Sequence, residues 1–345
     1  GIKSRLVYSE DGTKANVWAT IGADTRPGVV LSGHTDVVPA ERDGWESSPW
    51  ELTERHGKWY GRGSCDMKGF IAVCLAFVPD LVAARVQTPV HLCFSYDEEV
   101  GCIGVHRLVE DLHTLNYVPK IAIIGEPTMM QLIRGHKGKM LIKCRVSGKS
   151  GHSSYAPYQV NAVEYAARAI GIIADRAQEF ARKGPFNTSY TVPHTTMLTT
   201  LISGGVATNI TPDSAVFSFE IRNIPEHPGE EILLDLRCRV ETLFSEEIKK
   251  RFPEVGVDWE TEFSYPGMSV DEDTEGYRFI KEIHPSVGNC VSYGSEGGIF
   301  QQEGKIPAIL CGPGNIEQAH KRNEFVEKDQ IVQCVDFMKR LIKAL

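Results

Sequence analysis

The chain has 345 residues, of which 42% are hydrophobic and 24% charged, and its formal net charge is −8. This composition is typical of a soluble globular protein with one large domain or two ordinary ones, and it excludes a disordered or fibrous chain. The acidic balance argues against a nucleic acid or an anionic membrane as partner, because both require a basic surface.

Cysteine usage and the apolar pattern indicate a cytoplasmic protein. The nine cysteines include no Cys-x-x-Cys pair, which suits free thiols in a reducing compartment better than disulfides or a thiolate zinc site. The first residues contain no apolar core of a signal peptide. No stretch approaches the roughly 18 uncharged apolar residues that a membrane span requires, so we expect no contact with a membrane.

The first third of the chain alternates apolar strands with helices. Strands are predicted in "RPGVVLSGHTD" (26–36), "TPVHLCFSYDEE" (88–99) and "PKIAIIGEP" (119–127), and helices over 66–86 and 100–115. Continuously hydrophobic strands separated by helices are typical of an α/β fold, with a mostly parallel sheet covered by helices on both faces.

The pattern changes after residue 136. The segments 139–154, 195–205 and 213–225 alternate apolar and polar residues, as strands with one solvated face do, and 161–183 forms a long amphipathic helix. The first pattern resumes near 266, with a strand in "IPAILCGPG" (306–314) and a helix that ends at 345. We therefore predict a discontinuous α/β domain of residues 1–136 and 264–345, and an inserted smaller α+β domain of residues 137–263.

Side chains that can hold metal ions stand at the ends of the predicted strands and in the loops beside them. Chemistry collects at the carboxyl ends of strands in open α/β sheets. Two histidines and several carboxylates there form the N/O ligand set of two zinc-like cations, which would neutralise the acidic run "DEE" (97–99). The candidates are His34 and Asp36 in "SGHTD", Asp66 in "GRGSCDMKG", Glu98 and Glu99 in "SYDEE", Glu126 in "IIGEP", and His320 in "CGPGNIEQAH".

Each candidate taken alone has an ordinary structural explanation. A lone histidine is more often a hydrogen-bonded surface or core residue, and Asp66 can simply cap the helix that follows it. Glu126 can be a plain loop acid, and His320 stands beside the charged residues "KRNE". Their conjunction at five strand or loop ends favours the metal site.

The same motifs resemble those of a known family. "SGHTDVVP", "GRGSCDMKG", "DEEVG", "GEPT" and "GPGNIEQAH" occur in the order found in the dinuclear zinc amidohydrolase and peptidase family, and the resemblance covers the whole chain. The family includes acetylornithine deacetylases, succinyl-diaminopimelate desuccinylases, glutamate carboxypeptidases and aminoacylases. Its members usually open with a helical segment, whereas this sequence begins almost at the first strand.

The resemblance implies a site for two divalent metal ions, most often zinc, with cobalt and manganese as alternatives. Asp66 would bridge the two ions, and a cis peptide would follow it. His34 and Glu126 would complete the ligands of one ion. Glu99 and His320 would complete those of the other.

The resemblance also implies how the reaction proceeds. Glu98 would act as general base toward a hydroxide that bridges the metals, and then as acid toward the leaving amine. A further metal ligand is the alternative role for Glu98. Asp36 would hold the imidazole of His34 in orientation.

The inserted domain is implied to be a lid and dimerisation domain. His152, in "SGKSGHSS", would reach the active site of the other subunit of a homodimer and hydrogen-bond the developing oxyanion. Asn209 and Arg222 would bind the carboxylate of the substrate. The helix over 161–183 would join the dimer interface.

The resemblance is stronger to acetylornithine deacetylases than to desuccinylases in "YSEDGTKANVWATIG" (8–22) and in the region that begins "YGSEGG" (293–298). The predicted reaction is the hydrolysis of N2-acetyl-L-ornithine to acetate and L-ornithine in arginine biosynthesis, with Glu296 binding the cationic side chain of this small-molecule substrate. The alternatives within the family are a desuccinylase, a broad aminoacylase or a dipeptidase. A non-catalytic binding protein on the same fold is the alternative outside enzymes.

Overall fold

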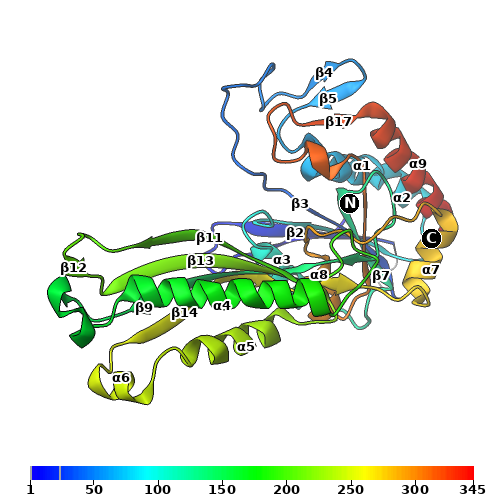
Figure 1. Ribbon diagram of the computed structural model, residues 1–345. Helices are drawn as coiled ribbons and strands as arrows, with labels where there is room; N and C mark the ends of the chain where they lie inside the picture. Colours follow the sequence, from blue (N-terminus) through cyan, green and yellow to red (C-terminus); the bar gives the residue numbers. More distant parts are fainter. Residues whose placement is uncertain (1, 23–24) are drawn as a thin grey trace. The chain divides into compact units, whose positions relative to one another are not determined.

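The computed structural model describes residues 2–22 and 25–345, and it divides into two compact units (Figure 1). Unit 1 comprises Gly1–His136 and Met268–Leu345, and unit 2 comprises Lys137–Gly267. Unit 2 ends at Gly267, four residues later than the boundary at residue 263 predicted from the sequence. The last strand of unit 2 causes this difference, because it continues to Tyr265.

Unit 1 is built on a six-stranded sheet whose central strands are parallel. β3 pairs in parallel with β6 and β7, and β16 pairs in parallel with β7, whereas β1 and β2 join antiparallel at one edge. All residues of β3, β6, β7 and β16 are buried, which explains why they are apolar without alternation. The strands are, in sheet order, β1 (Ser4–Tyr8), β2 (Ala15–Ile21), β6 (Val90–Ser95), β3 (Val29–His34), β7 (Ile121–Pro127) and β16 (Ala308–Gly312).

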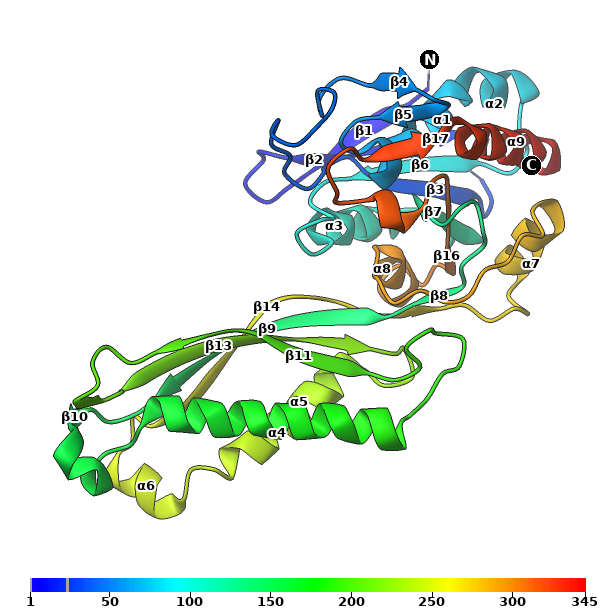
Figure 2. The ribbon, with the colours of Figure 1, turned by 45° about the horizontal axis from the view of Figure 1, so that its top comes forward.

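Helices cover both faces of this sheet, as Figure 2 shows for α1, α2 and α9 on one face and α3 and α8 on the other. The predicted α/β class is therefore confirmed. In α9, the buried residues Cys334, Phe337, Met338 and Leu341 recur at the spacing of one helix face. The helices are α1 (Gly69–Ala76), α2 (Val78–Ala84), α3 (Ile103–Leu112), α7 (Glu275–Ile283), α8 (Gly297–Gln302) and α9 (Lys328–Ala344).

The stretch Ser64–Ala84 is long and apolar enough to cross a membrane by length and composition alone, although it contains the charged residues Asp66, Lys68 and Asp80. It is not one continuous helix. The turn η1 (Ser64–Lys68) has non-helical backbone angles at Asp66 and Met67 and a cis bond between them, and α1 and α2 meet at Phe77. Several of its side chains, among them Phe70 and Leu81, belong to the hydrophobic core of unit 1.

Short elements complete unit 1. A three-stranded sheet and a two-stranded sheet lie in segments for which the sequence pattern predicts no strand. The elements are β4 (Thr53–Arg55), β5 (Lys58–Tyr60) and β17 (Phe325–Glu327) in the first sheet, β8 (Gly135–His136) and β15 (Met268–Ser269) in the second, and the turn η3 (Ile316–Gln318).

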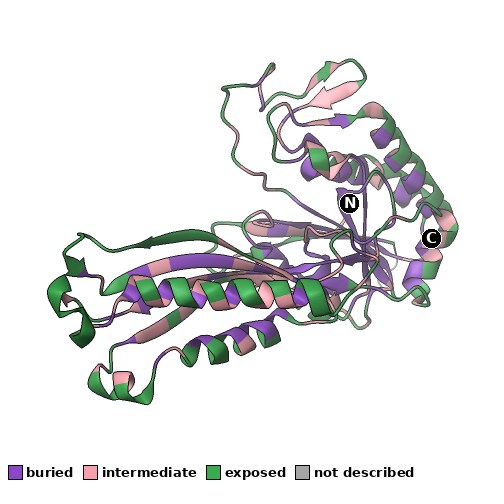
Figure 3. Ribbon diagram, in the orientation of Figure 1, coloured by how far each residue is buried: buried purple, intermediate pink, exposed green. Residues whose placement is uncertain are grey.

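Unit 2 is a four-stranded antiparallel sheet in the order β11-β13-β9-β14, with helices on one face. Alternate residues of β9, such as Ile142 and Cys144, are buried with residues of the long helix α4. Figure 3 shows the alternation of buried and exposed residues along α4 and the exposure of the edge strand β11. The elements are β9 (Gly138–Ser147), β10 (Gly151–His152), η2 (Ser153–Tyr158), α4 (Ala162–Lys183), β11 (Thr196–Gly204), β12 (Ile210–Thr211), β13 (Ser214–Asn223), α5 (Gly229–Glu241), α6 (Glu246–Arg251) and β14 (Gly256–Tyr265).

Candidate active site

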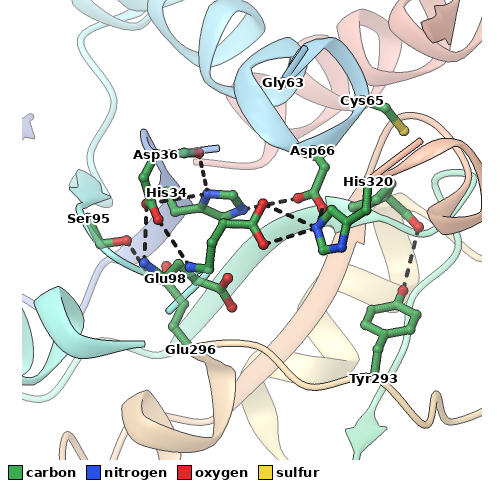
Figure 4. Close-up of polar contacts among 12 residues, drawn as sticks. His34, Asp36, Gly63, Cys65, Asp66, Ser95, Glu98, Tyr293, Glu296 and His320 are labelled. Carbon is green, nitrogen blue, oxygen red and sulfur yellow. Dashed lines mark hydrogen bonds and ion pairs between the residues drawn. The ribbon is translucent and has the colours of Figure 1, made fainter. Parts of the chain in front are cut away.

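The five side chains predicted as metal ligands meet in unit 1 at the carboxyl ends of the central strands. Figure 4 shows His34, Asp66 and His320 among them. All five come from different segments of the chain, which the parallel sheet brings to one edge. They are His34 at the end of β3, Asp66 in η1, Glu99 after β6, Glu126 in β7, and His320 after η3.

Asp66 lies between the two imidazoles. Its Oδ1 is 3.0 Å from His34 Nε2, and its Oδ2 is 3.2 Å from His320 Nε2. His320 Nε2 also lies 3.0 Å from Glu99 Oε2. A carboxylate that presents one oxygen to each of two histidines is arranged as a ligand shared by two metal ions.

The spacing of the donor atoms fits divalent cations. One ligand atom each from His34, Asp66 and Glu99 lie within 4.8 Å of one another, and so do ligand atoms of His34, Glu98 and Glu126. Imidazole and carboxylate donors are the set that zinc and similar ions bind. The second group contains Glu98, so the distances allow Glu98 to act either as a ligand or as a free base.

Two acidic side chains of the site, Glu98 and Glu126, favour their protonated forms when no cation is present. Burial raises the pKa of Glu98 to about 8 and that of Glu126 well above its ordinary value, and neighbouring carboxylates add to both shifts. Burial opposes the charged form of His34, but its contacts with Asp36 and Asp66 raise its pKa well above 6.5. A divalent ion supplies the positive charge that these protons would otherwise provide, so the donor set fits a metal centre.

Asp36 supports the site through two sets of contacts. Its backbone carbonyl lies 3.0 Å from His34 Nδ1, while its carboxylate Oδ1 is 3.6 Å from the same atom. The two carboxylate oxygens accept the backbone N–H groups of Glu98 and Glu99, at 3.2 and 3.1 Å. Asp36 therefore holds the loop of the two glutamates as well as the histidine.

The third acid of "DEE" does not belong to the site. Asp97 has a φ of 53°, in the left-handed region, so the chain turns directly after β6. Its carboxylate pairs with Lys14. Lys14 is thus the counter-charge of Asp97, and only Glu98 and Glu99 remain for the metal centre.

Glu296 does not occupy the position that the sequence suggested. It is 1% exposed, and its carboxylate accepts hydrogen bonds from the hydroxyl groups of Ser32 in β3 and Ser95 in β6. Burial raises its pKa, and the two serine hydrogen bonds partly offset that effect. The burial of this side chain and its two serine hydrogen bonds argue against the prediction that Glu296 binds a substrate side chain.

The three candidates of unit 2 fall at two places. His152 pairs with Ile210 at the β10–β12 contact, and the N–H of Ser153 donates to the carbonyl of Asn209 at 3.1 Å. β13 begins at Ser214, shortly after β12 in the chain. Arg222 lies eight residues further along β13, or roughly 27 Å of strand. One chain therefore brings His152 and Asn209 together and keeps Arg222 apart from both.

Sequence reasoning missed two residues around the site. No role was predicted for Glu324, which is 1% exposed and accepts the backbone N–H of Asp66. Its position directly before the apolar residues of β17 was the only local signal. Tyr293 has its hydroxyl 3.5 Å from the carbonyl of Pro127, and burial together with the charges of Glu126 and Asp66 raises its pKa.

Comparison with known proteins agrees with this geometry. The model of "Peptidase family M20/M25/M40" matches residues 30–344. An acetylornithine deacetylase of Pasteurella multocida is 32% identical over 350 residues, covering 99% of this chain and 87% of the relative. One of Proteus mirabilis is 33% identical over 331 residues, covering 96% and 82%.

Solved structures of the family share the fold. An M20 family metallo-carboxypeptidase from Sulfolobus solfataricus superimposes with a TM-score of 0.74 at 17% identity, over 99% of this chain and 90% of that one. A dinuclear metal-binding peptidase of the M20 family from Bacillus subtilis gives 0.63 at 15% identity, over 99% and 87%. The chain belongs to peptidase family M20/M25/M40 and is a metal-dependent hydrolase that acts on amide bonds.

Proposed function

We propose that the protein removes the acetyl group from N2-acetyl-L-ornithine, giving acetate and L-ornithine as a step of arginine biosynthesis. The observation that carries the hydrolytic chemistry is Asp66 shared between His34 and His320, with Glu98 beside them. The choice of substrate is supported by the relatives named acetylornithine deacetylase, which are 32–33% identical over nearly the whole chain.

The proposed cofactor is a pair of divalent ions, with zinc the first choice. Asp66 would be shared, His34 and Glu126 would hold one ion, and Glu99 and His320 the other. When bound, such ions polarise a substrate carbonyl and lower the pKa of water. The imidazole and carboxylate donors that lie close together, and the burial of His34, Asp66 and Glu126, support a divalent metal centre.

Glu98 is proposed to carry the proton. As a carboxylate it takes a proton from the attacking water, and as an acid it returns that proton to the nitrogen of the leaving amine. A raised pKa suits both roles, because the group must exchange its proton near neutral pH. The contacts of Asp36 with the backbone of Glu98 and Glu99 support a fixed position for this carboxylate.

Unit 2 is proposed to act as the lid and dimerisation domain. Since His152 and Asn209 are neighbours, we propose that they serve the partner subunit together, His152 at the developing oxyanion and Asn209 at the substrate carboxylate. Arg222 is proposed to bind the substrate carboxylate as well, with which its planar guanidinium can form two parallel hydrogen bonds. The exposed apolar residues of β11, namely Leu198, Leu201 and Ile202, support a homodimer through this strand.

The cellular location is proposed to be the cytoplasm. All nine cysteines are free, and eight of them are buried. Burial raises the pKa of buried thiols such as Cys74 and Cys311, so they remain protonated and inert.

A substrate panel tests the proposed function. The wild-type protein, loaded with zinc, is assayed with N2-acetyl-L-ornithine, N-acetyl-L-methionine, N-succinyl-L,L-diaminopimelate and a dipeptide. We expect the highest kcat/KM for acetylornithine. A higher value for the succinyl or dipeptide substrate would replace the proposed substrate but keep the hydrolase, whereas no turnover of any amide would support the non-catalytic alternative.

A further inference from the structure

Glu324 is a buried carboxylate that lies outside the metal centre, and its donors all come from one turn. Oε1 accepts the backbone N–H groups of Cys65 at 3.0 Å and Asp66 at 3.1 Å. Oε2 accepts the N–H of Gly63 at 3.1 Å and Nη1 of Arg62 at 2.7 Å. Four donors satisfy the two oxygens, which is the arrangement that a buried charge requires.

This carboxylate joins two segments that carry proposed ligands. His320 lies four residues before Glu324 in the chain. The backbone carbonyl of Glu324 accepts the N–H of Gly61 at 3.0 Å, and the following strand β17 pairs with β5. The contacts therefore tie the segment of His320 to the turn that presents Asp66.

The turn depends on an external acceptor. Its backbone is irregular, with φ of 79° at Gly63 and non-helical angles at Asp66. The N–H groups of Gly63, Cys65 and Asp66 are therefore not paired within a regular helix or strand. Buried N–H groups without partners are costly. Since Asp66 must present one oxygen to His34 and the other to His320, a small rotation of its backbone separates both pairs.

We propose that Glu324 is a positioning residue that sets the orientation of Asp66 for the two metal ions. The proposal deepens the proposed function and rests on it. It assigns to Glu324 a task beyond stability, because the backbone N–H of the shared ligand itself donates to this carboxylate.

The test compares three variants with the wild-type protein. Glu324→Gln removes the charge and turns an amide N–H₂ toward the N–H donors of the turn. Glu324→Asp keeps the charge but withdraws it by one methylene. His284→Gln is the matched control, because His284 is also buried in unit 1 and hydrogen-bonded, to the carbonyl of Met130 and to Arg340.

The measurements are the zinc dissociation constants by chelator competition, the absorption spectrum of the cobalt-loaded protein, and the urea midpoint of the metal-free protein. We expect Glu324→Gln to weaken zinc binding by about 10- to 100-fold and to change the cobalt spectrum. Its kcat for acetylornithine should fall while KM stays near the wild-type value. His284→Gln should lower the urea midpoint and leave zinc binding and the spectrum unchanged.

Glu324→Asp should give intermediate zinc affinity, and it carries the test if Glu324→Gln does not fold. Wild-type zinc affinity and spectrum in the Glu324 variants, with only a lowered urea midpoint, would overturn the proposal and leave the proposed function standing. A wild-type protein that binds no divalent ion would contradict the proposed function, and the inference with it.

Discussion

The carboxylates of Glu98 and Glu99 are adjacent in the chain, but the structure gives them different neighbours. Glu99 contacts His320, and Glu98 lies near His34, Glu126 and the thiol of Cys102, which is 3.4 Å away. The turn at Asp97 allows both to face the site although consecutive side chains of a regular strand diverge. We accordingly propose that Glu99 binds metal and that Glu98 transfers the proton.

Replacing Glu98 by Gln tests this separation. The variant should retain two metal ions per chain and lose turnover by about 10²- to 10⁴-fold, because proton transfer is lost while the ligands remain. Glu99→Gln is the control and should lose metal. Metal content and kcat are measured on both variants, and near-normal turnover of a fully loaded Glu98→Gln protein would remove Glu98 from its role.

Replacing Glu296 by Gln tests whether its burial decides its role. The amide oxygen of Gln accepts one serine hydroxyl, and the amide N–H₂ can donate to the oxygen of the other, so the variant stays buried between Ser32 and Ser95. KM should therefore change equally for acetylornithine and acetylmethionine. Glu296→Ala leaves a cavity and two hydroxyl groups without their partner, which should cost about 2–4 kcal/mol in unfolding free energy. A rise in KM confined to acetylornithine would restore the substrate-binding role.

At the level of elements, the sequence was informative where structure depends on local pattern. The apolar runs of β3, β6 and β7 identified parallel strands, and the parallel arrangement is why His34 and Glu126 could be expected at one edge. Local pattern did not predict the burial of Glu296 or Glu324. Their burial depends on partners more than 200 residues away in the chain, and no local spacing encodes such contacts.

The edge strand β11 carries the proposed dimer contact. Leu201→Lys should place a charge in that contact, because Leu201 is 68% exposed in the single chain. The variant should shift the protein from dimer to monomer in sedimentation velocity and reduce activity at low protein concentration.

Leu234→Lys is the matched control, since Leu234 lies on α5 and is 63% exposed. It should leave the oligomeric state unchanged. A wild-type monomer with full activity at high dilution would contradict both the dimer and the roles of His152 and Asn209 in the partner subunit.

For the whole molecule, the metal centre connects stability to pH. In the metal-free protein the pKa of Glu98 is raised from 4.5 to about 8, so its contribution to stability is complete below pH 4.5 and is lost as the pH rises to 8. The contacts of His320 with Asp66 and Glu99 raise its pKa from 6.5 to about 10. Its contribution to stability is therefore also lost as the pH rises, but over a higher pH range.

The urea midpoint of the metal-free protein should therefore fall between pH 5 and pH 8, and the gap to the zinc-loaded protein should widen. Glu98→Gln should reduce this fall, because the variant removes one of the titrating groups. A urea midpoint of the metal-free protein that is constant or rises over this range would contradict the raised pKa values of Glu98 and His320.

The central claim is that one chain holds two divalent ions through five side chains. The most direct measurement is the zinc content per chain by mass spectrometry after equilibration and removal of free metal. We expect two ions in the wild-type protein, two in Glu98→Gln, and none retained in Asp66→Ala, because the shared ligand serves both. A wild-type protein without zinc, or an Asp66→Ala variant that keeps both ions, would contradict the account.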